Sequence, residues 1–141
     1  MTEQSNPSER TSMAGAAAYD SPGAPFGRLW WNWPLTRLHL DREGGGLKGN
    51  EEYVPSFALA LLAAGAPRPD VRFRWEEVEK VELTKRKFAY FGNRGIRFVF
   101  ARAAQGVQGL ENFEFYPLSE HREERILDFA RAQGATVVQP G

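Results

Sequence analysis

The most informative part of the sequence is VRFRWEEVEKVELTKRKFAYFGNRGIRFVFA, residues 71–101. Apolar and polar side chains alternate within it around Phe73, Val81 and Phe98. Alternation with a period of two is typical of β-strands that bury one face and expose the other. The pair Glu76–Glu77 interrupts the pattern, so we expect the chain to turn or bulge there.

A hairpin is expected next in this stretch. One strand is predicted over residues 79–88, and the dipeptide Gly92–Asn93 favours the left-handed turn that would return the chain into a second strand over residues 95–101.

The segment RGIRFVF (94–100) echoes the RNP1 pattern of RNA-binding domains, in which exposed aromatic side chains stack on bases. That fold needs helices between its strands, and we predict none between residues 71 and 100. We therefore place Phe98 and Phe100 in the core and expect no nucleic-acid partner.

Length and composition indicate one domain. The chain has 141 residues, with 18 Lys and Arg balanced by 18 Asp and Glu, and no cysteine. This balance gives no global attraction to polyanions, and the absence of thiols fits a reducing compartment. No apolar run approaches the roughly 20 residues that span a bilayer. We expect a soluble cytoplasmic protein without a transmembrane segment.

Residues 1–25 are rich in Ser, Ala, Gly and Pro and lack a periodic apolar face. Such a segment buries too little surface to offset the entropy of ordering it. We therefore expect a disordered N-terminal tail, followed by one domain over residues 26–139.

Three tryptophans, Trp30, Trp31 and Trp33, open that domain. The cluster fits a packed core, and it also fits an aromatic contact surface for a partner. A strand around Leu38 follows, and the glycines at 44–46 predict a turn.

The apolar run FALALLAA (57–64) is flanked by Pro55 on one side and by Gly65 and Pro67 on the other. A short helix, a strand and an apolar loop are all compatible with residues 51–70.

The C-terminal part predicts a strand and then a helix. Phe113 and Phe115 alternate with polar residues, and Ser119 is a suitable N-cap for a helix from Glu120 to about Gln133. The apolar stripe of this helix consists of Ile126, Leu127, Phe129 and Ala130. Gly134 is expected to end the helix, and Thr136–Val138 to form a short extended segment.

Four segments together resemble the pleckstrin-homology-like (PH-like) superfold, most closely the small bacterial PH-like and GRAM-like domains. They are WPLTRLHLDREGGGL (33–47), FRWEEVEKVEL (73–83), GIRFVF (95–100) and ERILDFARAQGATVV (124–138). The resemblance covers roughly residues 28–138. It implies a mainly β fold, an antiparallel barrel of seven strands in two bent sheets, capped by one C-terminal α-helix.

The resemblance implies a binding module for lipid, peptide or protein. Members that bind phosphoinositides use Lys and Arg near the first strand and its loop, where this chain offers Arg37, Arg42 and Lys48 with acidic residues interleaved. That departure from the basic signature disfavours specific phosphoinositide binding.

The densest basic run comprises Lys85, Arg86 and Lys87, and Arg94 and Arg97 are expected beside it across the hairpin. These five residues are our candidate anion or lipid site, although a strand edge protected by lysine explains the same residues and is the interpretation that we favour.

Catalytic chemistry finds no support in the sequence. The two histidines, His39 and His121, lack the spacing of a nucleophile or metal site around them. We predict no enzymatic activity, metal or cofactor. Our leading hypothesis is a module that binds a protein or peptide through an open sheet edge or through Trp30, Trp31 and Trp33. The alternatives are anionic-lipid binding at a membrane surface and a small-molecule-binding barrel.

Overall fold

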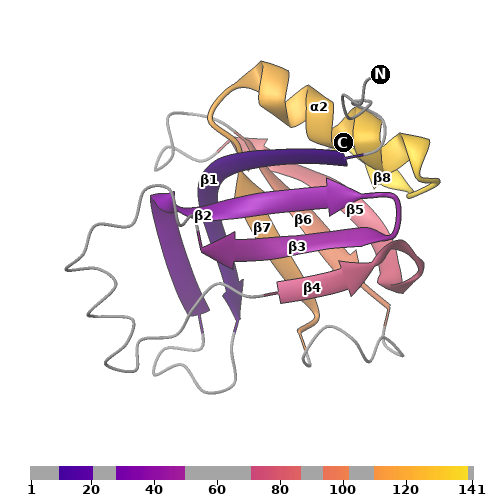
Figure 1. Ribbon diagram of the computed structural model, residues 1–141, viewed down its shortest axis with the longest axis horizontal. Helices are drawn as coiled ribbons and strands as arrows, with labels where there is room; N and C mark the ends of the chain where they lie inside the picture. Colours follow the sequence, from indigo (N-terminus) through magenta and orange to yellow (C-terminus); the bar gives the residue numbers. More distant parts are fainter. Residues whose placement is uncertain (1–9, 21–27, 50–70, 87–93, 102–109, 140–141) are drawn as a thin grey trace, which may run out of the picture.

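A computed structural model describes residues 10–20, 28–49, 71–86, 94–101 and 110–139. Within these ranges, the side chains of residues 20, 28–35, 85 and 86 also lie outside the description. The described residues are mainly β, with one helix near the C-terminus (Figure 1).

Eight strands form one sheet in the order β4-β3-β2-β1-β7-β6-β5-β8. They are β1 (Arg10–Asp20), β2 (Arg28–Asp41), β3 (Gly44–Gly49), β4 (Val71–Arg74), β5 (Val78–Arg86), β6 (Arg94–Phe100), β7 (Asn112–Tyr116) and β8 (Val137–Val138). A 3₁₀ turn, η1 (Trp75–Glu77), joins β4 to β5, and helix α2 spans Glu120–Ala132. All neighbouring strands are antiparallel except β5 and β8.

The sheet folds over on itself, so that β1–β4 lie in front of β5–β7 and the two sets of strands cross steeply (Figure 1). Aromatic side chains fill the space between these halves. The ring of Phe73 on β4 lies 5.4 Å from Phe98 on β6 and 6.0 Å from Phe113 on β7. The core is therefore the contact between the two inward faces.

The C-terminal helix covers one end of this core. Its predicted apolar stripe is buried, including Ile126 and Phe129, and the Phe129 ring lies 6.3 Å from that of Trp75. The hydroxyl oxygen of Ser119 accepts a hydrogen bond from the backbone N–H of Arg122 at 3.2 Å, and Gly134 ends the helix with φ of +86°. The predicted N-cap and helix stop are confirmed.

Several predicted strands are also confirmed. The strand predicted around Leu38 is part of β2, where Thr36, Leu38 and Leu40 are buried, and Phe98 and Phe100 lie in the core. Strands β5 and β6 form the predicted antiparallel pair, although their connecting residues lie outside the described ranges. Residues 51–70 also lie outside them.

The expected N-terminal tail is wrong for residues 10–20, which form the central strand β1. This strand pairs with β2 along its length and with β7 at Ala16–Ala18, where no residue is more than 1% exposed. Small side chains gave no apolar periodicity, yet they suit a strand beside Phe115 and Tyr116, whose bulk leaves little room. The folded domain therefore begins before residue 26.

The glycines at 44–46 lie in strand β3 rather than in a turn. The turn is one step earlier, where a carboxylate oxygen of Asp41 accepts hydrogen bonds from the backbone N–H groups of Glu43 and Gly44 at 2.8 and 2.9 Å. A Cβ on Gly46 would overlap the carbonyl oxygen of Val71 on β4. The glycines are thus explained by close approach of two strands.

Barrel closure was also predicted, and the described strands do not show it: they form one sheet whose ends are β4 and β8. The coarser prediction, a mainly β domain with a C-terminal helix, is confirmed.

We predict that Gly15→Ala lowers the free energy of unfolding by about 2 kcal/mol, because overpacking a filled core forces neighbours apart. A Cβ there would lie 2.6 Å from the Tyr116 carbonyl oxygen and still closer to the Phe115 ring. Urea unfolding measures the loss. Ala14→Ser, at the less buried neighbouring position, is the control, and equal stabilities for both variants would contradict this packing.

Candidate functional site

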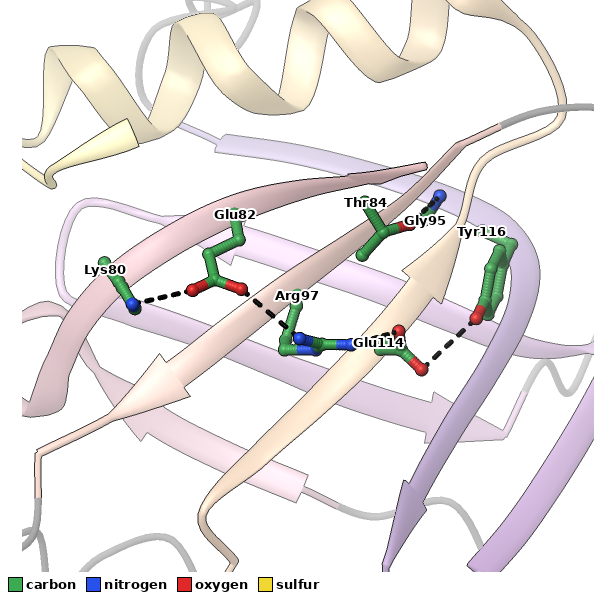
Figure 2. A network of polar contacts seen from close by, with 7 residues as sticks. All are labelled: Lys80, Glu82, Thr84, Gly95, Arg97, Glu114 and Tyr116. Carbon is green, nitrogen blue, oxygen red and sulfur yellow. Dashed lines mark hydrogen bonds and ion pairs between the residues drawn. The ribbon is translucent and has the colours of Figure 1, made fainter. Parts of the chain in front are cut away.

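The outward face of β5–β7 carries charges that neutralise one another (Figure 2). Lys80 Nζ lies 2.7 Å from Glu82 Oε1, and the Arg97 guanidinium lies 3.3 Å from Glu82 Oε2 and 3.1 Å from Glu114 Oε2. The hydrogen bond from Lys80 lowers the pKa of Glu82. This row is therefore a chain of ion pairs across three strands.

Glu114 is the buried member of that chain, at 1% exposure. Its second carboxylate oxygen accepts a hydrogen bond from the Tyr116 hydroxyl at 3.2 Å. A buried carboxylate is costly unless it is paired and hydrogen-bonded, so Arg97 and Tyr116 have a structural role here.

The outward face of β1–β4 is different. Residues paired in register share a face, which places Ser12, His39, Gly46 and Arg72 in one row across four strands. The adjacent row is Ala14, Arg37 and Lys48. We call the outward side chains of Ser12, Arg37, His39 and Lys48 the basic face.

Cations predominate on the outward side of these four strands. In the described residues it carries five, Arg10, Arg37, Lys48, Arg72 and Arg74, against the single carboxylate of Asp41. Arg74 is neutralised by Glu76 of η1 at 3.2 Å. Arg37 and Lys48 have no ion pair with any described residue.

The register places Arg37 directly opposite Lys48. Like charges at directly opposed positions destabilise a sheet. Protection of an exposed edge does not explain Arg37, because β2 lies between β1 and β3. At Lys48 the described pairing of β3 with β4 has already ended, at Leu47. The arrangement has a cost in stability that an anion bound between the two cations would remove.

His39 lies in the centre of the basic face. Its Nδ1 is 3.2 Å from the hydroxyl oxygen of Ser12 on β1. Partial burial and then the positive charges of Lys48 and Arg37 lower the pKa of His39, whereas Asp41 acts in the opposite direction. The imidazole therefore senses a positive local field.

The structure separates the residues of the predicted anion site. Arg97 is held by its two carboxylates, whereas Arg94 lies on the other face of the sheet, where it lines a cavity of about 460 Å³ with Leu83 and acidic residues of α2. The backbones of Lys85 and Arg86 end strand β5, and Lys87 lies outside the described residues.

The predicted tryptophan site is placed only through its backbone. Trp30 and Trp31 pair with Ala18 and Ala17, and Trp33 lies in the same strand, β2. Their side chains lie outside the described residues, so the choice between core and contact surface stays a prediction.

The described residues contain no group of three His, Cys, Asp or Glu side chains that could hold a metal ion. Nor does the described helix have the length and apolar character that a membrane crossing requires. Comparison of the sequence with protein-family models and with curated proteins found no match.

The sequence pattern indicated Arg37 and Lys48 only in connection with phosphoinositide recognition, and it showed no nucleophile or metal spacing around His39. The position of the turn between β2 and β3 is the feature of the sequence that could have predicted this pair. Once the turn begins at Asp41, counting outward through Leu40 and Gly45 pairs Arg37 with Lys48.

We predict that Arg97→Met lowers the free energy of unfolding by about 2 kcal/mol. Removing one partner of a fully buried pair costs about 3–5 kcal/mol, and partial exposure of Arg97 reduces that figure. Urea unfolding measures the loss, and Arg125→Met on the exposed side of α2 is the control. Adding Glu114→Gln to Arg97→Met should restore part of the stability. No restoration would contradict a charge-pairing role.

A second prediction concerns pH. Because the pKa of His39 is lowered in the folded protein, the unfolded state binds more protons in the window just below the ordinary value of 6.5. Stability should therefore rise with pH through that window and level off above it. Urea unfolding between about pH 5 and about pH 7.5 should show a smaller rise for His39→Gln than for the unchanged protein. An equal rise would contradict the lowered pKa.

Proposed function

We propose that this protein is a non-enzymatic, PH-like interaction module that binds a protein or peptide partner through the basic face. The strand order supports the resemblance on which the proposal rests. A meander of four strands, β1–β4, is joined through the β1–β7 pairing to a meander of three, β5–β7, and a helix follows. The proposal keeps the cytoplasmic location expected for a chain without cysteines.

The observation that carries the proposal is the contrast between the two outward faces. In β5–β7, the charges of Lys80, Glu82, Arg97 and Glu114 are balanced. On the basic face, Arg37 and Lys48 lie opposite one another on interior strands, in a chain whose formal net charge is zero. A charge excess concentrated on one face favours a partner of the opposite sign.

Anionic lipid binding is the second candidate, because the same cations attract a charged bilayer. Each cation near such a surface contributes only about 1 kcal/mol. The described basic face has no large apolar side chain that could insert among lipids: its members are Ser12, Arg37, His39 and Lys48. We therefore favour a protein partner. The tryptophan cluster at Trp30, Trp31 and Trp33 stays a candidate second contact.

Site-specific photo-crosslinking tests the proposal. A photoreactive phenylalanine replaces Ser12, which is exposed on the basic face, or His121, which is exposed on α2. In cells that express the chain, we expect the probe at position 12 to capture a discrete protein and the probe at position 121 not to do so. Adding Lys48→Glu should abolish the adduct.

Adducts of equal yield from both positions, or none at position 12, would refute binding through this face. Anionic vesicles are the parallel assay for the second candidate. Sedimentation with vesicles that depends on Lys48, without a protein adduct, would favour the lipid function instead.

A further inference from the structure

We propose that the basic face binds an extended acidic segment of the partner, with two carboxylates at alternate positions. This inference rests on the proposed function and specifies the partner's chemistry. Its first element is the pair Arg37 and Lys48. Adjacent strands lie about 4.8 Å apart, so one carboxylate above this row can contact both cations.

The second element is the spacing of the rows. His39 lies two residues from Arg37 along β2, a separation of about 6.8 Å in an antiparallel strand. An extended peptide repeats its same-side positions at the same interval. When one carboxylate lies over Arg37 and Lys48, the side chain two positions away lies over His39 and Ser12. Both of these side chains are polar and are already in contact at 3.2 Å.

The third element is the end of the track. Asp41 follows in the next row and is exposed, and its carboxylate accepts two backbone hydrogen bonds of the turn. The register places Arg10 opposite Asp41, so this row pairs a cation with a carboxylate and offers a third acidic residue of the ligand no net attraction. The face thus favours two acids at alternate positions, and a lysine at the next alternate position can contact the Asp41 carboxylate.

Other polyanions fit this face less well. Single-stranded nucleic acid is bound largely by stacking of bases on aromatic side chains, and the only ring on the described basic face is that of His39, half-buried. Among its described side chains, Ser12, Arg37, His39 and Lys48, the face also has none of the apolar anchors that strengthen attachment to a bilayer. A protein segment needs only the charges and hydrogen bonds that the face offers.

The test uses the full chain and two labelled peptides that contain Glu-Thr-Glu-Thr-Lys or Gln-Thr-Gln-Thr-Lys. Fluorescence anisotropy at about 50 mM and about 300 mM NaCl reports the affinity. We expect the Glu peptide to bind at least about tenfold more tightly than the Gln peptide at low salt, and to weaken at high salt. Lys48→Glu should reduce its affinity about tenfold or more.

The matched control is Arg125→Glu, which makes the same change in net charge on the exposed side of α2 and should leave binding unchanged. Loss of fold cannot explain the Lys48→Glu result, because a glutamate opposite Arg37 replaces a repulsion by an attraction. Its melting temperature should equal or exceed that of the unchanged protein.

A second readout locates the ligand. A carboxylate beside the His39 imidazole favours its charged form, so the titration midpoint of the His39 ring, followed by NMR, should rise when the Glu peptide is added. The Gln peptide should leave it unchanged. A merely structural His39 would not respond in this way.

The failures are distinguishable. Equal binding of both peptides, or no effect of Lys48→Glu, overturns the acidic-segment inference, while a position-12 adduct would still support the proposed function. The acidic-segment inference is also overturned if the protein does not bind the Glu peptide but shows Lys48-dependent binding to another polyanion. The polyanions to be tested are vesicles with roughly one-third anionic lipid and a single-stranded oligonucleotide. Absence of both peptide binding and any adduct overturns both proposals.

Discussion

The packing of one half of the sheet against the other is the constraint on which the structure depends. Phe73 comes from the end strand β4, yet its ring contacts Phe98 and Phe113 at the opposite side of the core. Phe98 and Phe113 stack with ring centroids 4.9 Å apart. Because these side chains are held between two layers of one chain, every second residue of each strand is committed to the interior, and its neighbours form the outward surface.

The two outward surfaces differ in how their charged side chains are paired. In β5–β7 the buried carboxylate of Glu114 forms an ion pair with Arg97, and Arg97 also forms an ion pair with Glu82. That row links three strands by ion pairs and leaves little unbalanced charge for recognition. In β1–β4 the side chains of Arg37 and Lys48 face each other across a register that their strands cannot change without exposing Leu38 and Leu47. Burial of Leu38 and Leu47 on the inward face therefore keeps Arg37 and Lys48 opposite each other on the outward face.

This coupling between faces bears on the proposed function. Bulk composition is neutral, so no long-range attraction would be expected from the net charge. The fold nevertheless sorts the charges, pairing them on one surface and concentrating cations on the other. A surface that tolerates like-charge repulsion gains from an anionic partner more than a balanced surface does, because binding also relieves the internal repulsion.

Sequence pattern alone determined the amphipathic strands around Val81 and Phe98, the helix that begins after Ser119 and ends at Gly134, and the mainly β class. These features depend on local periodicity, capping and turn chemistry, which neighbours in the chain dictate.

Tertiary structure decided the remainder. Strand β1 has no apolar periodicity, because its small residues pack beside the bulky side chains of β7. The glycines of β3 are required by the close approach of β4 and not by a turn. The basic face depended on that second point: a turn centred on Gly45 would have placed Lys48 opposite Arg42, whereas the turn at Asp41 places it opposite Arg37. Pairing between distant residues follows from register, and register is set by what both faces of the sheet can bury together.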